Sequence, residues 1–309
     1  MRPVLIVGSL NIDYIAAVER LPAPGETVAA TQLIQRFGGK GANQAIAAVR
    51  QRVPVSMLGC VGADDAGRAY CKRLRSEGIN AAGISTTRRA LTGTALIAVD
   101  QSAENTIVVA AGANGELKLA AIRAQRARIA AASLLLLQLE VPMATVIEAV
   151  RQANRAQVPV VLNPSPLRDG FPWGKCQLDT VIANAGEAQA IFGLPIEQLS
   201  ASLPEWRSAL ATHRIGWLII TRGAQSTLCL SATDFFEVPT LAVKPVDTVG
   251  AGDAFAGTFV ARRAEGADVA TAVRYANCAG ALATLKAGAQ EAIPNRSATE
   301  KACRFRHHG

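Results

Sequence analysis

A short glycine-rich stretch, residues 247–255 (DTVGAGDAF), combines groups that could bind an anion with one that could move a proton. Its small residues run directly into an apolar segment that favours a helix, so backbone N–H groups and the positive end of the helix dipole would point at the same anion. Asp253 lies at the expected helix start, where aspartate is a favoured cap. A carboxylate beside an anion site repels phosphate, so a plain cap is an unusual choice there. A general base that serves a hydroxyl group explains both the carboxylate and its place beside the anion site. The stretch is therefore a predicted phosphate site with a candidate base, and a plain helix cap is the alternative.

Two further stretches place polar side chains beside glycines. Residues 37–45 (FGGKGANQA) put glycines before a helix-like segment, with Lys40 and Asn43 able to reach a ligand. Residues 8–13 (GSLNID) follow the first expected strand, and ligands of α/β sheets bind beyond the carboxyl ends of strands. Asn11 and Asp13 are short polar groups suited to sugar hydroxyls. Taken alone, each stretch is also typical of an ordinary turn.

Other chemistries find little support in the residues. The chain has 3 histidines, two of them in the tail, and it contains no HExxH, GxSxG or GxxxxGK[ST] motif. Its 6 cysteines are scattered without a CxxC pair, and Cys60 and Cys229 lie in strand-like runs that suit buried free thiols. A reducing, cytoplasmic location is the simplest interpretation.

The composition describes a folded chain with a basic surface. The sequence has 309 residues, 50% of them hydrophobic and 18% charged, which excludes a disordered chain. No apolar run approaches the roughly 20 residues that a membrane helix needs, so no membrane partner is expected. The net charge is +8, but the basic residues do not cluster with aromatics, so no nucleic-acid partner is expected either. We assign no function to the basic tail, residues 304–308.

The elements that must position these groups alternate along the chain. Short apolar runs predict strands over 4–7, 55–61, 134–139, 158–162, 180–183 and 217–221. Helical patterns lie between them over 42–50, 66–77, 117–129, 144–156 and 205–213, and two more follow over 254–263 and 269–285. This alternation predicts an α/β fold in which a doubly wound, mostly parallel sheet is flanked by helices.

Two segments break the alternation. Residues 15–36 contain prolines, a glycine and short apolar pairs without a helical period, and residues 94–99 and 106–110 have the pattern of a hairpin. They predict a small separate β-sheet, formed by about 15–36 and 92–111, that needs cover from a substrate, a partner subunit or both. We expect a single α/β domain, residues 1–309, that carries this sheet as a lid.

Taken together, these motifs resemble a known family. GGKGANQA near the start and DTVGAGDAF near the end match the two signature regions of the PfkB-type sugar kinases. In detail the chain is most similar to the ribokinase group of that family, in the segments NID, TGTALI, ENTIVVAAGAN, LLLQLE, NPSP and VIANAGEA. The resemblance covers residues 3–294 and implies a ribokinase-like fold that dimerises through its lid.

The resemblance also implies roles for individual residues. The sugar would be held by Asn11, Asp13, Gly39, Lys40, Asn43 and Glu140. Asp253 would be the catalytic base, beside an anion hole formed by the amides of Gly250, Ala251 and Gly252. Magnesium and phosphate would be supported by Asn184 and Glu187, and the nucleotide by Thr221, Gly223 and Asn277. A monovalent cation would bind Asp247 and the carbonyls of Val249, Ala283, Lys286 and Gly288.

Three positions depart from the family pattern. Ser226 replaces a glycine of the nucleotide loop, which puts the conformation of that loop in doubt. Ala292 stands where relatives often have a serine near the cation. The chain after Pro294 lacks the usual final apolar helix pattern.

The implied activity is transfer of the γ-phosphoryl group of ATP to the primary O5 hydroxyl of D-ribose, with Mg²⁺ as cofactor and K⁺ as activator. Deoxyribose, a fructose-like sugar or an adenosine-like nucleoside are alternative acceptors. A sugar- or nucleotide-binding regulator without catalysis is an alternative of a different class, against which the intact Asp253 and glycine turn both count. For cation binding, the alternative is that Asp247 only caps its own turn.

Overall fold

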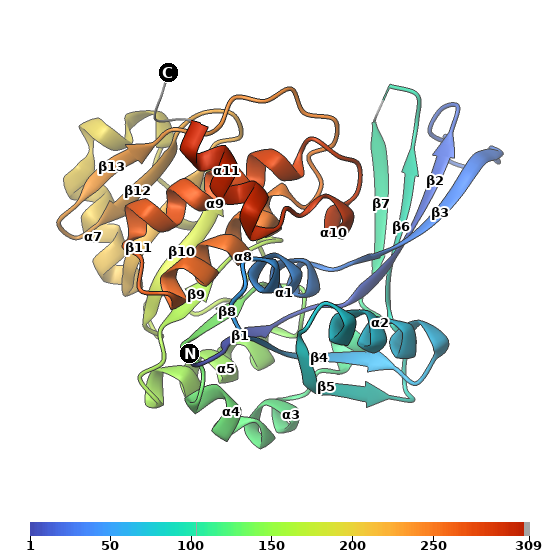
Figure 1. Ribbon diagram of the computed structural model, residues 1–309, viewed down its shortest axis with the longest axis horizontal. Helices are drawn as coiled ribbons and strands as arrows, with labels where there is room; N and C mark the ends of the chain where they lie inside the picture. Colours follow the sequence, from blue (N-terminus) through green and yellow to red (C-terminus); the bar gives the residue numbers. More distant parts are fainter. Residues whose placement is uncertain (103, 306–309) are drawn as a thin grey trace.

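A nine-stranded sheet runs through the body of the protein (Figure 1). The computed structural model describes residues 1–102 and 104–305. In spatial order the strands are β13 (Phe235–Val238), β12 (Thr227–Ser231), β11 (Ile215–Thr221), β10 (Leu178–Asn184), β9 (Val160–Leu162), β8 (Leu134–Leu137), β1 (Val4–Val7), β4 (Val55–Gly62) and β5 (Asn80–Thr87). The strands from β11 to β5 are parallel, and β12 and β13 are antiparallel to their neighbours. The predicted α/β class with a mostly parallel sheet is confirmed.

Helices cover both faces of this sheet because its inner strands are apolar on both sides. In β1, Val4 and Ile6 join one hydrophobic core, and Leu5 and Val7 join the other. The first core is covered by α1 (Lys40–Arg50), α2 (Asp65–Ser76), α8 (Ala251–Ala264) and α9 (Val269–Ala283). The second is covered by α3 (Leu119–Ala124), α4 (Arg126–Ala130), α5 (Met143–Arg155), α6 (Ala185–Phe192) and α7 (Leu203–His213). Two short helices, α10 (Ala289–Ala292) and α11 (Arg296–Phe305), end the described chain.

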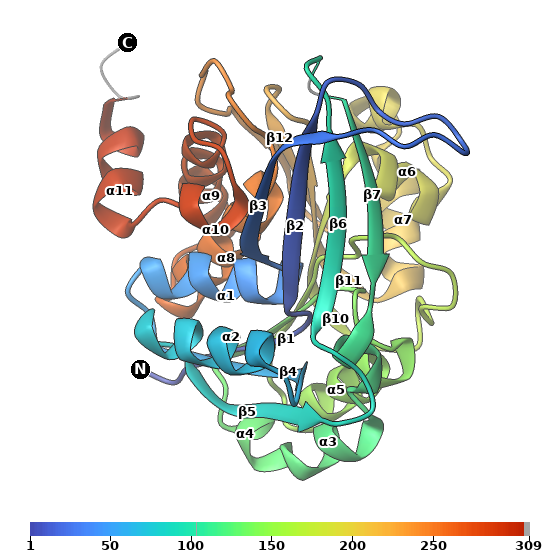
Figure 2. The same ribbon diagram turned by 90° about the vertical axis from the view of Figure 1, so that its right-hand side faces the viewer.

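A four-stranded sheet stands at one side of the body, and we call it the small sheet (Figure 2). Its order is β3 (Ala30–Gly38), β2 (Asn11–Val18), β6 (Gly93–Val99) and β7 (Asn105–Ala110). The antiparallel pair β6–β7 confirms the predicted hairpin. The sheet begins earlier than expected, because Asn11 and Asp13 belong to β2 and not to a turn after β1.

The order of the strands places the ends of β1 and β8 side by side. The chain leaves β1 to form β4 and β5 on one side, and later forms β8, β9, β10 and β11 on the other. At such a switch point the connections diverge and leave a crevice beyond the carboxyl ends of the strands. The segment after β1 enters the small sheet at Asn11, and the segment after β8 carries Gln138 and Glu140. The switch point therefore faces the base of the small sheet.

Some elements differ from the sequence prediction. The strands β5 and β13 were not predicted, since their segments show neither a clear alternation nor a long apolar run, and β12 was noted only as a strand-like run around Cys229. The single helix predicted over 117–129 was wrong: a 3₁₀ turn, η1 (Gly112–Glu116), precedes two short helices, and the N–H of Gln125 donates to Ile122 in a tight turn that ends α3. A second 3₁₀ turn, η2 (Ile196–Ala201), precedes α7.

The segment after Pro294 forms a helix, α11, despite its lack of a strong apolar pattern. Asn295 caps its first turn by accepting the N–H of Ala298 at 3.0 Å. Its Arg296 pairs with both Glu300 and Glu265, which ties the helix to the end of α8. Part of the basic tail, residues 306–309, lies outside the described residues.

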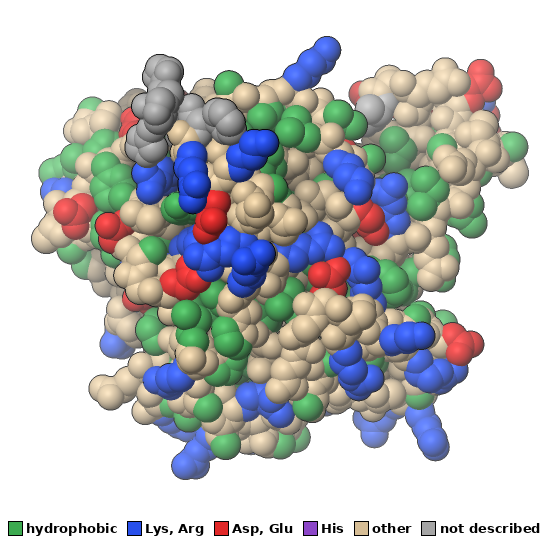
Figure 3. Space-filling model, viewed as in Figure 1, with side chains coloured by type: hydrophobic (Ala, Val, Ile, Leu, Met, Phe, Trp, Pro, Cys, Tyr) green, Lys and Arg blue, Asp and Glu red, His purple; other side chains and the backbone are tan. Residues whose placement is uncertain are grey.

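The surface is basic but mixed in sign. Lys and Arg side chains spread over the face in Figure 3, with Asp and Glu side chains among those near its middle. The thiols of Cys60 and Cys229 are free and buried, as expected. Among the described helices, none has the length and apolar character that crossing a membrane requires.

Candidate active site

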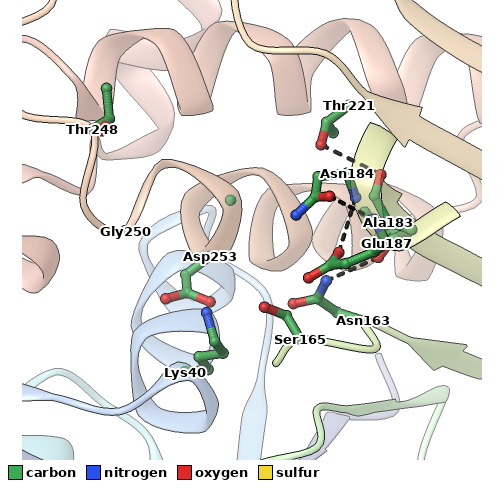
Figure 4. Close-up of a pocket in the computed structure, with 12 residues that line it drawn as sticks. Lys40, Asn163, Ser165, Ala183, Asn184, Glu187, Thr221, Thr248, Gly250 and Asp253 are labelled. Carbon is green, nitrogen blue, oxygen red and sulfur yellow. Dashed lines mark hydrogen bonds between the residues drawn. The ribbon is translucent and has the colours of Figure 1, made fainter. Parts of the chain in front are cut away.

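A cavity of about 230 Å³ opens where α8 begins, beyond the carboxyl ends of the body strands (Figure 4). Its lining is polar and comes from distant parts of the chain: Lys40, Asn163, Ser165, Ile182, Ala183, Asn184, Glu187, Thr221, Thr248, Gly250, Gly252 and Asp253. Parallel strands end at a common edge, which is why these segments meet. The cavity thus contains the predicted base together with residues from the predicted sugar, phosphate and nucleotide sets.

Asp253 lies in the first turn of α8 with 6% of its surface exposed. Its two carboxylate oxygens accept hydrogen bonds from Asn43 Nδ2 and Gln44 Nε2, each at 2.9 Å. Burial raises the pKa of Asp253, and the charge of Lys40 and the two amide hydrogen bonds oppose that rise. In Figure 4 the Lys40 side chain extends beside the carboxylate. Both carboxylate oxygens accept side-chain hydrogen bonds from α1 rather than N–H groups of their own helix, which favours a chemical role over a helix cap.

Several of the predicted sugar-binding residues meet at the base of the small sheet, near the start of α1. Gly39 precedes α1 and lies against the backbone of Asn11 at the start of β2. Asn11 accepts a hydrogen bond from Asn114 Nδ2 at 2.7 Å, which fixes its side chain. Glu140, after β8, accepts the backbone N–H of Lys40 at 3.0 Å. The structure therefore brings predicted residues from β2 and from the segment after β8 together at the start of α1.

Asp13 is a further carboxyl of this group whose pKa is raised. It lies on β2 opposite Arg36 of β3, two residues from Asn11 and therefore on the same face of the small sheet. Burial, together with the negative charges of Glu140 and Glu291, raises the pKa of Asp13 to about 7. A carboxyl that titrates near neutral pH beside other acids suits a site whose ligand supplies hydroxyl donors.

The glycine turn before α8 has the geometry of an anion site. Gly250 is the N-cap and has φ 77°, a left-handed conformation that favours glycine. Gly250 and Gly252 line the cavity, and the helix start directs unpaired N–H groups toward it. The amide of Ala251 differs, because it donates to the Thr248 carbonyl at 3.3 Å. Two of the three residues of the predicted anion hole therefore line the cavity, and the role of their amides stays a prediction.

Asn184 and Glu187 form a capping box at the start of α6. The Asn184 side chain accepts the N–H of Glu187 at 2.8 Å, and the Glu187 carboxylate accepts the N–H of Asn184 at 2.9 Å. Both side chains also line the cavity, where Figure 4 shows them near Asn163 and Ser165. The capping bonds use part of each side chain and leave further oxygen lone pairs facing the cavity.

A second cavity, of about 270 Å³, adjoins the first at Thr221 and Gly252 and is mostly apolar. Its lining includes Gly223, Phe255 and Asn277. Asn277 is buried, where its amide donates to the carbonyls of Val238 and Pro239 and its oxygen accepts from Thr227. Asn277 thus shapes the cavity wall through internal hydrogen bonds. An apolar slot beside a phosphate site fits a purine base.

One departure from the family pattern, at Ser226, and one residue of the predicted cation site, Asp247, can be judged on this geometry. Ser226 does not have a positive φ, so the backbone of the nucleotide loop has a conformation there that serine tolerates. Asp247 accepts backbone N–H groups from Val249 at 3.0 Å and Gly288 at 2.9 Å. Its charge is therefore partly stabilised by the two loops that it joins.

Several residues near the cavity were missed in the sequence. Gln44 belongs to the glycine-rich stretch 37–45, but its hydrogen bond to Asp253 cannot be foreseen from residue type. Gln138 and Gln290 reach the same group of side chains. Gln138 lies in the LLLQLE segment, but neither glutamine was singled out in the sequence. Asn163 accepts from Gln44 at 3.0 Å, and only its place in the NPSP segment could have suggested it. Within the described residues, no group of three or more His, Cys, Asp or Glu side chains could hold a metal ion alone.

Fold and site together match one class of enzyme. The model of the pfkB family carbohydrate kinases matches residues 1–296, and the chain belongs to this family. It is 34% identical to the ribokinase of Haemophilus influenzae over 296 residues, which cover 95% of this chain and 96% of that one. A deoxyribokinase of Salmonella typhi is 31% identical over 293 residues, with 94% and 95% covered. The solved structure of an Arabidopsis thaliana ribokinase complexed with ribose and ATP matches with a TM-score of 0.88 and 25% identity, and covers 98% of this chain and 99% of that one.

Proposed function

We propose that this protein is an ATP-dependent sugar kinase that phosphorylates the primary O5 hydroxyl of D-ribose. The observation that carries the proposal is the buried Asp253, placed between an anion turn and the polar residues at the base of the small sheet. The ribokinase relatives supply the choice of ribose among sugars. Asn11, Asp13, Gly39, Lys40, Asn43 and Glu140 would bind the sugar.

The proposed step needs positioning and charge stabilisation more than covalent catalysis. Asp253 accepts the proton of the O5 hydroxyl while that oxygen forms a bond to the γ-phosphorus. The bond from this phosphorus to the β,γ-bridging oxygen breaks, and ADP leaves with the electron pair. The amides of Gly250 and Gly252 and the ammonium of Lys40 stabilise the negative charge on the transferred group.

The residues around the triphosphate fit a magnesium ion. Glu187 and Asn184 present hard oxygen donors at the cavity, and Mg²⁺ commonly binds one or two such groups through water together with substrate phosphates. When bound, Mg²⁺ neutralises charge on the phosphate oxygens. The adenine would enter the apolar second cavity between Gly223 and Asn277.

We also propose that K⁺ activates the enzyme through Asp247 and the carbonyls of Val249, Ala283, Lys286 and Gly288. The loops fit a cation in one respect, because Asp247 joins the anion turn to the segment before α10. They fit less well in another, because Ala292 offers no hydroxyl and two amides already stabilise the carboxylate. A weak effect of K⁺ is therefore expected.

The small sheet would act as a lid, and two copies would pair through it in a cytoplasmic homodimer. It exposes several large apolar side chains: Leu33, Leu96, Ile107, Val108 and Val109 are each more than half exposed. Leu96 and Val108 are register partners and so lie on one face. Sedimentation of the protein with Leu96→Lys and Val108→Lys tests the pairing: a wild-type monomer would contradict it.

A coupled ATP assay across sugars tests the main proposal. Ribose should give the highest kcat/KM, ahead of 2-deoxyribose, fructose and adenosine. The deoxyribokinase relative makes 2-deoxyribose the strongest competitor, and a higher value for it would replace ribose as the acceptor. Binding of ribose and ATP without turnover of any acceptor would favour a non-catalytic regulator.

A further inference from the structure

The amide groups that touch Asp253 have two unlike ends. Asn43 and Gln44 each carry an N–H₂ donor and a carbonyl acceptor, and a half-turn of the side-chain amide exchanges them. Only the donor end stabilises a carboxylate, and a carbonyl oxygen turned toward Asp253 would repel it. In the structure both side chains present their donor ends, Asn43 to one oxygen of Asp253 and Gln44 to the other. Something must select this orientation at both positions.

Each acceptor end is occupied by a further glutamine. Gln290 Nε2 donates to Asn43 Oδ1 at 3.1 Å, and Gln138 Nε2 donates to Gln44 Oε1 at 2.5 Å. Two chains of side-chain amides therefore converge on the same carboxylate. One begins in α10 and the other begins after β8, on opposite sides of α1.

The two outer glutamines are themselves fixed. Both are fully buried. Gln290 Nε2 also donates to the Tyr70 hydroxyl at 2.8 Å, and that hydroxyl donates to the carbonyl of Gly38. The carboxamide of Gln138 packs on Gly8, where an added Cβ would lie 2.0 Å from Oε1. Burial and these contacts restrict both side chains, whose Oε1 atoms have no hydrogen-bond partner within the described residues.

We propose that Gln290 and Gln138 are positioning residues that lock the amides of Asn43 and Gln44, so that N–H donors face both oxygens of Asp253. This inference rests on the proposed role of Asp253 as the base. The lock leaves the carboxylate one orientation, with its remaining lone pairs directed at the cavity and the acceptor hydroxyl. It also favours the ionised form of Asp253, the form that can take a proton.

The direction of the effect follows from the charges around Asp253. Burial and the charge of Glu140 favour its neutral form, whereas Lys40 and the two amide donors favour the ionised form. Release of either donor shifts this balance toward the neutral form and raises the pKa of Asp253. Turnover then requires a higher pH, so the acid limb of the kcat profile moves upward. A residue that only filled space would not move it.

The experiment replaces each outer glutamine by methionine, which is unbranched, similar in size and without a strong donor. Gln290→Met and Gln138→Met, singly and together, are assayed at saturating ribose and ATP across pH. Each single variant should move the acid limb upward by about 0.5–1 pH unit, which is roughly a threefold to tenfold loss of kcat on that limb. The alkaline plateau should change far less, and the double variant should show the larger shift.

Gln51→Met is the matched control. Gln51 is also buried, and it donates to the Pro294 carbonyl and the Thr299 hydroxyl, away from Asp253. It should lose thermal stability without any shift of the acid limb. If the Gln290 and Gln138 variants behave in the same way, the proposal is wrong. Leucine at the same positions repeats the comparison if a methionine variant does not fold.

Asp253→Asn separates this proposal from the proposed function. If that variant keeps near-normal turnover, Asp253 is not the base and both proposals fall. If it is inactive while the glutamine variants keep the wild-type acid limb, the base assignment stands and the amide lock alone is overturned.

Discussion

The two halves of the cleft are built in different ways. On the proposed acceptor side, buried side chains bind one another, as Asn43 and Gln44 do around Asp253. On the proposed phosphate-donor side, the backbone dominates: the glycine turn contains the start of α8, and the side chains of Asn184 and Glu187 cap the helix that they begin. The acceptor side depends on particular side chains, and the donor side depends mainly on the path of the chain.

This difference indicates where the family can vary. Backbone amides and helix starts bind phosphate whatever the neighbouring side chains, so a serine at position 226 leaves the donor side workable. A buried network of amides and carboxylates has no such tolerance, because removal of one partner leaves another unsatisfied. Substitutions on the acceptor side should therefore cost more activity than comparable ones on the donor side.

The largest effect is expected for Asp253→Asn. The amide keeps the shape of the side chain but cannot take the hydroxyl proton, so kcat should fall by about 10²–10⁴-fold. Ribose and ATP should still bind, which calorimetry can measure. Turnover within a few-fold of wild type would show that Asp253 is not the base. The expected contrast in sensitivity between the two halves of the cleft would then lose its main support.

A smaller, one-sided effect is expected for Asp13→Ala. Loss of the carboxylate leaves sugar hydroxyls unpaired in a closed site, at about 1–3 kcal/mol, or roughly tenfold to a hundredfold in sugar KM. The KM for ATP should change little, because Asp13 lies on the small sheet and away from the nucleotide cavities. Equal changes for both substrates would mean that Asp13 only shapes β2.

Sugar binding should also depend on pH through the same residue. The pKa of Asp13 is raised to about 7, so its carboxylate is increasingly neutralised as pH falls below 7. Ribose affinity, measured by calorimetry between pH 8 and 6, should weaken by up to about tenfold per unit below 7. Asp13→Asn should bind weakly at every pH. A wild-type affinity that is flat over this range contradicts the assignment.

The folding stability that Asp13 contributes should depend on pH in the opposite direction to ribose affinity. Because the folded-state pKa of Asp13 lies above its unfolded value of about 3.9, the contribution of this group is fully present below pH 4 and is lost as pH rises through 7. Ribose should restore part of that loss, since it binds the ionised form. Thermal unfolding with and without ribose at pH 6 and 8 measures both effects.

The smallest effect is expected on the donor side, for potassium. Two backbone amides already stabilise Asp247, so a bound cation would only tighten the anion turn, with activation of about fivefold. Activity is titrated with potassium chloride against tetramethylammonium chloride at matched ionic strength. No response to potassium would leave the capping role of Asp247 as its whole function.

Much of the fold could be predicted from the sequence, and the reasons are local. The buried parallel strands are continuous apolar runs, such as residues 134–137. Such a run can be recognised as a strand without knowledge of the strands beside it. The strand β5 and the break at Gln125 could not be predicted, because pairing and turn geometry decide them. The C-terminal helix α11 relies on a cap and ion pairs with α8, which a search for apolar periods does not detect.

The candidate site shows the same division. The glycine turns and short polar residues are visible as motifs, and the structure brings Asn43, Lys40 and Asp253 together. The glutamines that contact them, Gln138 and Gln290, could not be assigned a role from residue type, because a buried glutamine cannot be told from a surface glutamine until the fold is known. Their part in the site depends on tertiary contacts alone.

The bond between Gln44 and Asp253 joins residues 209 positions apart, which has a consequence for the order of assembly during synthesis. At roughly 5–20 residues per second, a ribosome needs on the order of 10–40 s to extend the chain from the first residue to the second. The residues proposed to hold the sugar are all made before Asp253. A nascent chain that stops short of α8 therefore contains every proposed sugar ligand but lacks the proposed base, so on this assignment phosphorylation would begin only when α8 packs against α1.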